Sequence, residues 1–253
     1  MTLTHEDILN YCNYLINKDQ VSDPVSPVEY NSIIPVVNIE VFHREKRRIT
    51  ELSISKQMNF IELLRDSYLN ELKKVINGEA VSPIKLEDDY DMMLSSRIVI
   101  GGIGRKVNIV PETKFNELAN GLVDNVDSVY GYLVNKYVYL SANGTEFTYH
   151  YLALPARPYY DYYIDSGHNQ KYLKPGWTVK QGQGEYYIVD SSNVTVVRQI
   201  TYPFIPDYQS KSVEFSYGDS AYTEIVNLVF EKMGVEIRER LPIDFAQMKK
   251  SEG

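Results

Sequence analysis

Cysteine is almost absent from this chain, and so are long apolar runs. Cys12 is the only cysteine among 253 residues, so an intrachain disulfide and a zinc site built on cysteines are both excluded. The first fifteen residues include His5, Glu6 and Asp7 and have no apolar core, which argues against a secretory signal. No stretch reaches the roughly 18 apolar residues that a membrane helix needs. We therefore expect a protein of a reducing compartment without a membrane segment.

Positive charge is in deficit. The chain has 26 Lys and Arg against 34 Asp and Glu, a formal net charge of -8. A sequence-independent nucleic-acid binder needs surplus cations that displace counterions from phosphates, so the balance disfavours that class. An acidic wall would instead suit a channel through which DNA slides without adhering.

One basic run stands out against this background: Arg44, Lys46, Arg47 and Arg48. We expect it at the end of the second helix, where cations complement the helix dipole. Contact with DNA or with an acidic partner is the alternative for this run.

Sequence motifs of catalysis and cofactor binding are missing. The glycines of 101–104 precede Arg105 and Lys106 but lack the spacing of a phosphate-binding loop, so they predict a turn. The four histidines are isolated, and no nucleophile elbow is present. These absences favour a non-enzymatic protein with no cofactor and no metal.

Carboxylates leave one catalytic alternative open. The cluster at 87–91 lacks the glycine and the final glutamate of a calcium loop. Asp161, Asp165 and Asp207 form a second group, and Asp161 with Asp207 would supply a glycosidase acid and nucleophile if they met in space. Surface aspartates near turns are the commoner explanation.

Tyrosine is the residue in excess, with 22 copies against 14 glycines. Its ring is apolar on its faces and polar at its tip, and it loses little rotamer entropy on binding. Tyrosine therefore suits surfaces that are dry in an assembly and wet outside it.

Helical signals occupy the first part of the chain. Residues 4–17 have apolar positions at three- and four-residue steps, with Thr4 as N-cap. The run Ser26-Pro27-Val28-Glu29 is a capping box, and Pro35 predicts a kink or an early stop. A third apolar stripe predicts a helix from Gln57 to Ile76.

Extended segments follow. Residues 98–100 and 106–110 predict a hairpin around the glycines of 101–104, and residues 136–140 and 145–152 predict another through Asn143-Gly144. Further strands are expected at 159–164, 185–189, 194–200 and 211–217. The glycines and prolines within 165–184 predict an exposed loop.

The order of these elements predicts an α+β fold. We expect a helical region at 1–82, then a central antiparallel β-rich body, sandwich or barrel-like, at 83–218. A C-terminal helix and tail at 219–253 complete the chain, with Ser220 as its cap and Gly234 at its end.

The tyrosine-rich strands supply the candidate subunit interface. The prolines at 155 and 158 indicate that the segment Pro155 to Ile164 is an edge strand or arm. The candidate interface residues are Tyr137, Tyr139, Tyr149, Tyr151, Arg157, Tyr159, Tyr160, Tyr162 and Tyr163.

Three segments together resemble virion structural proteins of tailed phages that infect Bacteroidota, with the crAss-like phages as the clearest case. The segments are Ser26-Pro27-Val28-Glu29-Tyr30-Asn31, Tyr151-Leu152-Ala153-Leu154-Pro155-Ala156-Arg157-Pro158, and Glu224-Ile225-Val226 with 233–239. The resemblance spans most of the chain, and its motifs are structural, without a catalytic signature.

The resemblance implies a head-to-tail connector ring protein in the neck or tail of a virion, assembled in the host bacterial cytoplasm. It implies a homo-oligomer, a dodecamer that matches a portal, and contacts with the portal protein and other connector or tail rings. Genomic DNA would pass through the lumen without sequence-specific binding. A carbohydrate-binding tail or surface module that uses the tyrosines of 159–163 is the alternative.

Overall fold

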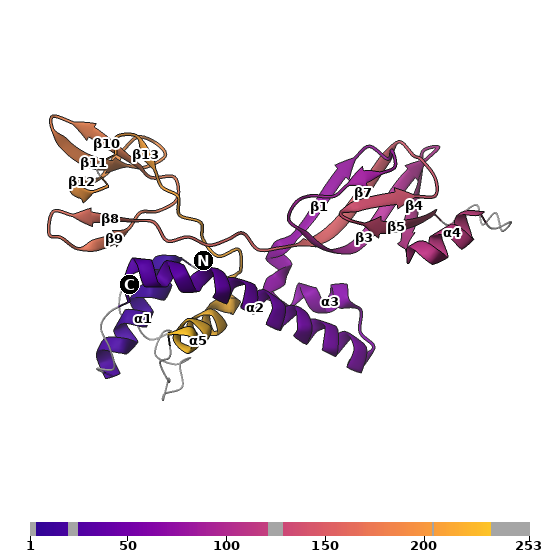
Figure 1. Cartoon of the computed structure of the whole chain (residues 1–253), viewed down its shortest axis with the longest axis horizontal. Coiled ribbons are helices and arrows are strands. Elements are labelled where there is room, and N and C mark those ends of the chain that lie inside the picture. The colour runs from indigo at the N-terminus through magenta and orange to yellow at the C-terminus, as the bar shows by residue number, and fades with distance from the viewer. Residues whose placement is uncertain (1–3, 20–24, 121–128, 204, 234–253) are drawn as a thin grey trace. The chain divides into compact units, whose positions relative to one another are not determined.

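The computed structural model describes residues 4–19, 25–120, 129–203 and 205–233. Two compact units divide the chain (Figure 1). The terminal unit comprises Met1–Glu51 and Pro155–Gly253, and the central unit comprises Leu52–Leu154. The strands of the predicted β-rich body are thus divided between two units, because packing does not follow the order of helix and strand along the chain.

The fold class is α+β, as the sequence predicts. Helices lie at the start of the chain and near its end, and the strands between them form two curled, mostly antiparallel sheets. None of the helices in the described ranges is long and apolar enough to cross a membrane.

Side-chain N-caps start the first two helices of the terminal unit, and the second of them is a full capping box. Helix α1 (His5–Asp19) follows Thr4, whose Oγ1 accepts the Asp7 N–H at 3.2 Å and donates to the Asp7 carboxylate at 2.6 Å. Helix α2 (Pro27–Lys56) follows Ser26, whose N–H and hydroxyl both donate to Glu29 Oε2, at 3.0 and 2.7 Å. Both predicted starts are confirmed.

Helix α2 continues past Pro35, so the predicted early stop is wrong. Proline in a helix interior costs about 3 kcal/mol through its missing N–H and its steric clash. Burial offsets this cost here, because α2 keeps one buried stripe on both sides of Pro35. The stripe consists of Pro27, Tyr30, Ile34, Val37, Asn38, Val41, Phe42, Glu45 and Ile49.

The single helix predicted from Gln57 to Ile76 is wrong. The segment forms α3 (Phe60–Arg65), the short 3-10 helix η1 (Tyr68–Leu72) and strand β1 (Lys73–Gly78). Asn59 and Ser67 each accept a backbone N–H two residues on, at 3.0 and 3.1 Å, and so begin two separate helical turns.

The central unit is built on a seven-stranded sheet in the order β1-β7-β3-β4-β5-β6-β2 (Figure 1). Its remaining strands are β2 (Ile84–Lys85), β3 (Tyr90–Ile100), β4 (Ile103–Ile109), β5 (Val129–Val134), β6 (Tyr137–Leu140) and β7 (Glu146–Ala153). Among the described strands of this sheet, β4 and β5 alone pair in parallel, and α4 (Glu112–Asn120) lies between them in the chain. One face of the sheet holds a core that includes Ile98, Val107, Val138 and Phe147.

One predicted hairpin of this sheet is confirmed and the other is wrong. Strands β3 and β4 pair across Gly101 and Gly102, whose φ angles are +58° and +81°. Strands β6 and β7 form where expected but pair with other strands. The hairpin turn is instead Asn135-Lys136, which joins β5 to β6 with φ angles of +49° and +64°, as a two-residue type I′ turn requires.

Gly144 serves close packing and not a turn. A Cβ on this residue would lie 2.4 Å from the Val99 carbonyl oxygen and 2.7 Å from Ile98 Cγ1. The backbone before β7 therefore approaches β3 more closely than any side chain allows.

The terminal unit contains a six-stranded sheet in the order β13-β10-β11-β12-β8-β9. Its strands are β8 (Tyr162–Asp165), β9 (Gln170–Tyr172), β10 (Thr178–Gly182), β11 (Glu185–Val189), β12 (Thr195–Tyr202) and β13 (Tyr208–Gln209). Its core consists of Tyr163, Leu173, Val179, Ile188 and Ile200.

The exposed loop predicted at 165–184 is wrong, because this segment contains β9 and β10. Leu173 and Val179 are fully buried. The glycines that suggested a loop flank a tight turn, in which Gln183 and Gly184 have φ angles of +52° and +84°. The strand predicted at 211–217 is reduced to a single bridge between Val213 and Tyr159.

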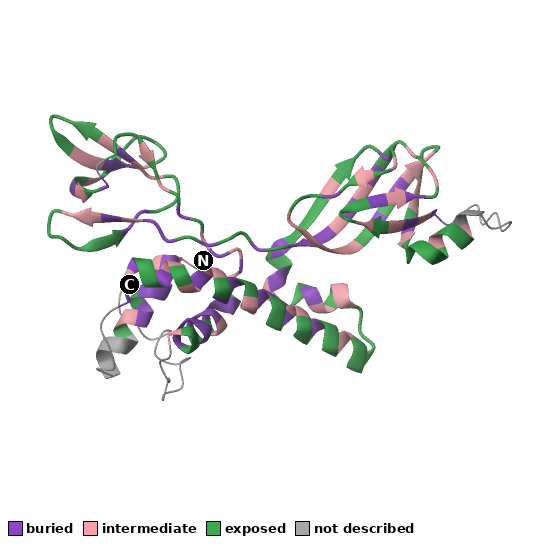
Figure 2. Ribbon diagram, viewed as in Figure 1, coloured by how far each residue is buried: buried purple, intermediate pink, exposed green. Residues whose placement is uncertain are grey.

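The C-terminal helix is α5 (Tyr222–Lys232), preceded by the 3-10 helix η2 (Asp219–Ala221). Ser220 lies inside η2 and does not cap α5, because η2 extends the helical path upstream of the predicted start. Six residues of α5 are buried, and the helix packs against α1 (Figure 2). The predicted end at Gly234 and the tail at 243–250 lie outside the described residues.

Candidate functional site

The predicted interface tyrosines of β7 belong to the core. Tyr149 and Tyr151 are 2% and 1% exposed, and their rings lie 5.6 Å apart. The Tyr151 hydroxyl donates to Asp89 Oδ1 at 2.9 Å. Both side chains point inward because alternate residues of a strand share a face, and Phe147 is on the same face. Neither tyrosine is available to a partner.

The two candidate tyrosines of β6 differ from each other. Tyr139 is half-buried and stacks on Tyr132 with ring centroids 4.8 Å apart, while Phe115 of α4 packs against Tyr132 at 4.6 Å. Tyr137 is exposed. Only Tyr137 presents a large free aromatic surface on this strand.

In the terminal unit, Tyr160 and Tyr163 are also buried, so these two interface predictions are wrong. Tyr163 belongs to the core of the six-stranded sheet. Tyr160 stacks on Tyr172, with ring centroids 4.9 Å apart, and contacts Tyr30 edge-on at 5.7 Å. Asn31 holds the Tyr160 backbone at both N–H and C=O, at 2.8 and 2.7 Å. The segment after Pro158 is therefore anchored to α2 and is not a free arm.

Two exposed tyrosine rings lie beside two half-buried ones, and we call the four the tyrosine patch: Tyr159 and Tyr202 with Tyr162 and Tyr208. Tyr159 and Tyr202 are 41% and 42% exposed. Tyr162 stacks on Tyr202, with ring centroids 5.4 Å apart and planes 24° apart. Partial burial, followed by neighbouring charges that include Asp161, raises the pKa of Tyr159, Tyr162 and Tyr208. These three hydroxyls remain neutral hydrogen-bonding groups at neutral pH.

Asp161 fixes the tyrosine patch from beneath. Its carboxylate is buried and accepts hydrogen bonds from the Tyr208 hydroxyl at 2.8 Å, from the Lys211 N–H at 3.0 Å and from its neighbour's N–H at 3.0 Å. The backbone of Tyr159 exchanges two hydrogen bonds with Val213, at 3.0 and 2.9 Å. The rings are thus held on a stiff support and lose little entropy on binding a partner.

Sequence reasoning identified Tyr159 and Tyr162 but missed Tyr202 and Tyr208. The missed tyrosines lie about forty residues downstream, on β12 and β13. The pairing of β12 with β8 brings Tyr202 to the patch, and the hydrogen bond from the Tyr208 hydroxyl to Asp161 at 2.8 Å holds Tyr208 there. Arg157 is exposed in the segment before β8, as expected.

The aspartates of the glycosidase alternative have structural roles. Asp161 already has its hydrogen bonds inside the protein, whereas the Asp207 side chain is 74% exposed and forms an ion pair with Lys180. Asp165 accepts the N–H groups of Gly167 and Asn169 at 2.9 Å each, and these bonds, led by Asn169, lower its pKa. These contacts explain the aspartates as turn and anchor residues.

The basic run lies in the interior of α2 and not at a helix end, because the helix continues to Lys56. Arg44 pairs with Glu40 at 2.5 Å and with Glu231 of α5 at 3.4 Å. Arg48 binds both carboxylate oxygens of Glu45 at 2.5 and 2.6 Å. Carboxylates of the same chain therefore neutralise two of the four cations predicted to meet DNA or a partner.

A buried histidine lies near the start of the chain. His5 is fully buried, with Nε2 2.7 Å from the Val213 carbonyl oxygen and Nδ1 3.1 Å from the Tyr30 hydroxyl. Burial lowers the His5 pKa to about 4, although the hydrogen bond to Val213 acts in the opposite direction. The neutral ring thus donates from Nε2 and accepts at Nδ1. Burial raises the pKa of Glu214, which accepts the backbone N–H of His5 at 2.9 Å.

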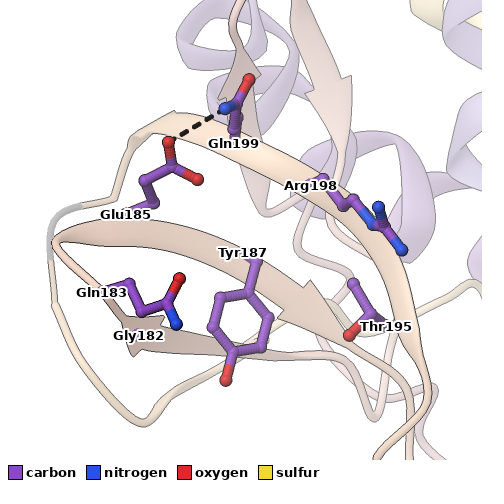
Figure 3. Close-up of a pocket in the computed structure, with 7 residues that line it drawn as sticks. All are labelled: Gly182, Gln183, Glu185, Tyr187, Thr195, Arg198 and Gln199. Atoms are coloured by element: carbon purple, nitrogen blue, oxygen red, sulfur yellow. Dashed lines mark hydrogen bonds between the residues drawn. The ribbon is translucent and has the colours of Figure 1, made fainter.

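A polar groove of about 620 Å³ lies over the outer face of β10, β11 and β12 (Figure 3). Seven residues line it: Gly182, Gln183, Glu185, Tyr187, Thr195, Arg198 and Gln199. The Gln199 side-chain amide donates to Glu185 at 2.9 Å across the groove. The groove thus combines one aromatic ring with a carboxylate, a guanidinium and two amides.

No family model matches the chain, and no curated protein is similar to it. Within the described ranges, no cluster of histidine, cysteine, aspartate or glutamate could hold a metal ion.

Proposed function

We propose that this chain is a non-enzymatic structural subunit of a tailed-phage virion, one copy of a homo-oligomeric ring in the head-to-tail connector. The observation that carries the proposal is the tyrosine patch, an exposed and rigidly supported aromatic surface. Tyrosine is enriched at protein interfaces because its ring buries much area and its hydroxyl stays paired. The resemblance of the three segments named above to phage virion proteins supports the choice of assembly.

A second exposed surface lies on α2, and we call it the α2 stripe. Val28, Val36 and Ile39 are exposed at intervals of eight and three residues, so they follow one helical face, away from the buried stripe. A ring built from heterologous contacts needs two different patches on each subunit. The tyrosine patch of one subunit and the α2 stripe of the next meet this need.

The acidic balance of the chain suits the proposed ring. A net charge of -8 per subunit would repel DNA phosphates from much of the lumen, so that genomic DNA slides through. The proposed partners are the portal protein and the other connector or tail rings, and the proposed location is the neck or tail of the virion.

Two double variants test the proposed contact. Tyr159→Ser with Tyr202→Ser removes exposed rings, and Val36→Asp with Ile39→Asp places charge on the α2 stripe. We expect each variant to fold and neither to form rings in analytical ultracentrifugation. The tyrosine variant keeps its α2 stripe, and the α2 variant keeps its tyrosine patch. A mixture of the two should therefore form dimers only, because each pair has one intact contact and no surface left for a third subunit.

The matched control is Tyr14→Ser with Val194→Ser, which also removes two exposed apolar side chains but from outside the tyrosine patch and the α2 stripe. This control should assemble like the parent protein. Rings that persist in both test variants, or that are lost equally in the control, would contradict the proposed interface.

A carbohydrate-binding module is the second candidate, and the groove of Figure 3 favours it. Sugar rings stack on aromatic side chains, and their hydroxyls bond carboxylates, amides and guanidinium groups. If this candidate holds, Tyr187→Ala should abolish binding on a glycan array while the fold is retained. Tyr160 and Tyr163 are unsuitable for this test, because both are buried.

A further inference from the structure

Polar and basic side chains gather on the outer face of the seven-stranded sheet, opposite the core. Arg97 of β3 lies directly across from Lys106 of β4 and from Thr148 of β7 in the strand register. His150 is two residues further along β7, opposite Ser95. Residues directly opposite in a sheet share a face, so three neighbouring strands present these groups together.

These side chains line a cavity of about 350 Å³. Its lining consists of Ser95, Ser96, Arg97, Lys106, Thr148 and His150. Each of these side chains has a hydrogen-bond donor and none is a carboxylate, and of the hydroxyls Ser96 already donates to the Val107 carbonyl oxygen at 3.3 Å. The cavity thus has a local charge opposite in sign to that of the whole chain, whose net charge is -8.

The two cations of the cavity are not neutralised by their surroundings. Neither Arg97 nor Lys106 forms an ion pair with any residue in the part of the chain that the structure describes. The nearest acid along β7 is Glu146, which accepts the Thr148 hydroxyl at 3.4 Å and does not line the cavity. Like charges directly opposite in a sheet are destabilising, so an anion between them would relieve a cost of folding.

Gly104 sets the position of the Arg97 guanidinium. A Cβ on Gly104 would lie 1.9 Å from Arg97 Nη2 and 2.2 Å from Arg97 Cζ. The guanidinium therefore lies directly over the Gly104 backbone, in space that any other residue would fill. The absence of a side chain at this position keeps Arg97 against the sheet, beside the cavity.

We propose that this cavity binds a phosphate of a nucleic-acid backbone. A planar guanidinium, an ammonium and hydroxyl groups are the side chains that most often contact phosphate oxygens. The lining has no Phe, Tyr or Trp ring and no apolar side chain, so we expect the contact to read the phosphate backbone and not the base sequence. The proposed site does not depend on ring assembly. Each subunit would bind DNA weakly at this site, with an affinity that falls as the salt concentration rises.

Fluorescence anisotropy with the full-length chain and a DNA duplex of about 20 base pairs tests the site, at salt between about 50 and 200 mM. The double variant Arg97→Gln with Lys106→Gln removes two phosphate contacts. The fall of log K with log salt should therefore become shallower, by about 1.8 in the magnitude of the slope. Binding at about 50 mM salt should fall by roughly 100-fold on the same rule. The matched control is Arg65→Gln with Lys114→Gln, which removes the same charge elsewhere in the central unit and should leave the slope unchanged.

The variant Gly104→Ala tests the position of the Arg97 guanidinium without changing the charge of the cavity. This variant keeps every cation but displaces the flexible Arg97 side chain, so it should weaken duplex binding by roughly tenfold, the loss of one contact. Circular dichroism should show that it folds. Equal slopes for the cavity variant and its control would overturn the proposal. Binding of inorganic phosphate or of polyglutamate as tight as that of the duplex would also overturn it, because the site would then select a small anion or an acidic peptide.

Discussion

The buried imidazole of His5 should make the terminal unit sensitive to acid. In the folded state the His5 pKa is lowered from 6.5 to about 4 by burial, with no exposed surface on the side chain. Between these two values the unfolded chain binds a proton that the folded chain does not. The free energy of unfolding is therefore highest above the unfolded-state pKa of 6.5. It decreases as the pH falls from 6.5 toward the folded-state pKa of about 4.

The size of the effect follows from the two pKa values. Linkage gives a loss of about 2 kcal/mol in the free energy of unfolding between about pH 7 and pH 5. Glu214 opposes part of this loss, because burial raises its pKa and the folded state takes up a proton there first. The tyrosines around His5 stay neutral in this range, since burial raises the pKa of Tyr30, Tyr160 and Tyr172.

Urea unfolding followed by tryptophan fluorescence measures this loss. Trp177 is the only tryptophan in the sequence and packs against the core of the six-stranded sheet, so its emission reports the terminal unit. His5→Gln should remove most of the pH dependence. His168→Asn is the control, since His168 is exposed in a turn with a φ of +65°, which asparagine tolerates.

A direct titration keeps the reasoning testable even if His5→Gln does not fold. The His5 ring signals in nuclear magnetic resonance spectra should shift with a midpoint near 4. A midpoint near 6.5, or an equal loss of stability in the parent and in His5→Gln, would refute a buried neutral histidine.

Two further substitutions test the backbone of the fold. Gly144→Ala should lower the free energy of unfolding by about 1–3 kcal/mol, because its Cβ would lie 2.4 Å from the Val99 carbonyl oxygen, whereas Gly78→Ala has no atom within 4 Å. Equal effects of the two changes on urea unfolding, followed by circular dichroism, would argue against close packing at Gly144. Ser26→Ala should cost about 1 kcal/mol through the lost capping box, and Ser32→Ala on the same helix should cost less. A Ser26→Ala variant as stable as the parent in tryptophan-detected urea unfolding would contradict this role.

Local signals in the sequence predicted the local structure well. The N-cap predicted at Thr4 and the capping box predicted at Ser26 mark true helix starts, since the side chain and the backbone N–H it bonds are three residues apart. The turn at Gly101-Gly102 and strand β11 also form as expected. In each case the decisive contact lies within a few residues of the signal.

The sequence did not predict which strands pair with each other or which tyrosines are buried, because both depend on contacts between distant parts of the chain. Asn143-Gly144 has the composition of a hairpin turn, yet β6 pairs with β5 and β2, and β7 pairs with β1 and β3, which lie far upstream in the chain. The pairing of β7 places Tyr149 and Tyr151 in the core, and in the other sheet the pairing of β12 with β8 brings Tyr202 beside Tyr162. The tyrosine excess was visible from composition, but which rings face a partner depends on which strands lie side by side.

The oligomeric state of the purified protein tests the proposed function most directly. The chain has a mass of 29.2 kDa, so a ring of twelve copies would have a mass of about 350 kDa. Negative-stain electron microscopy with mass photometry should show closed rings, formed alone or on addition of a portal protein. A protein that stays monomeric under both conditions would contradict the account.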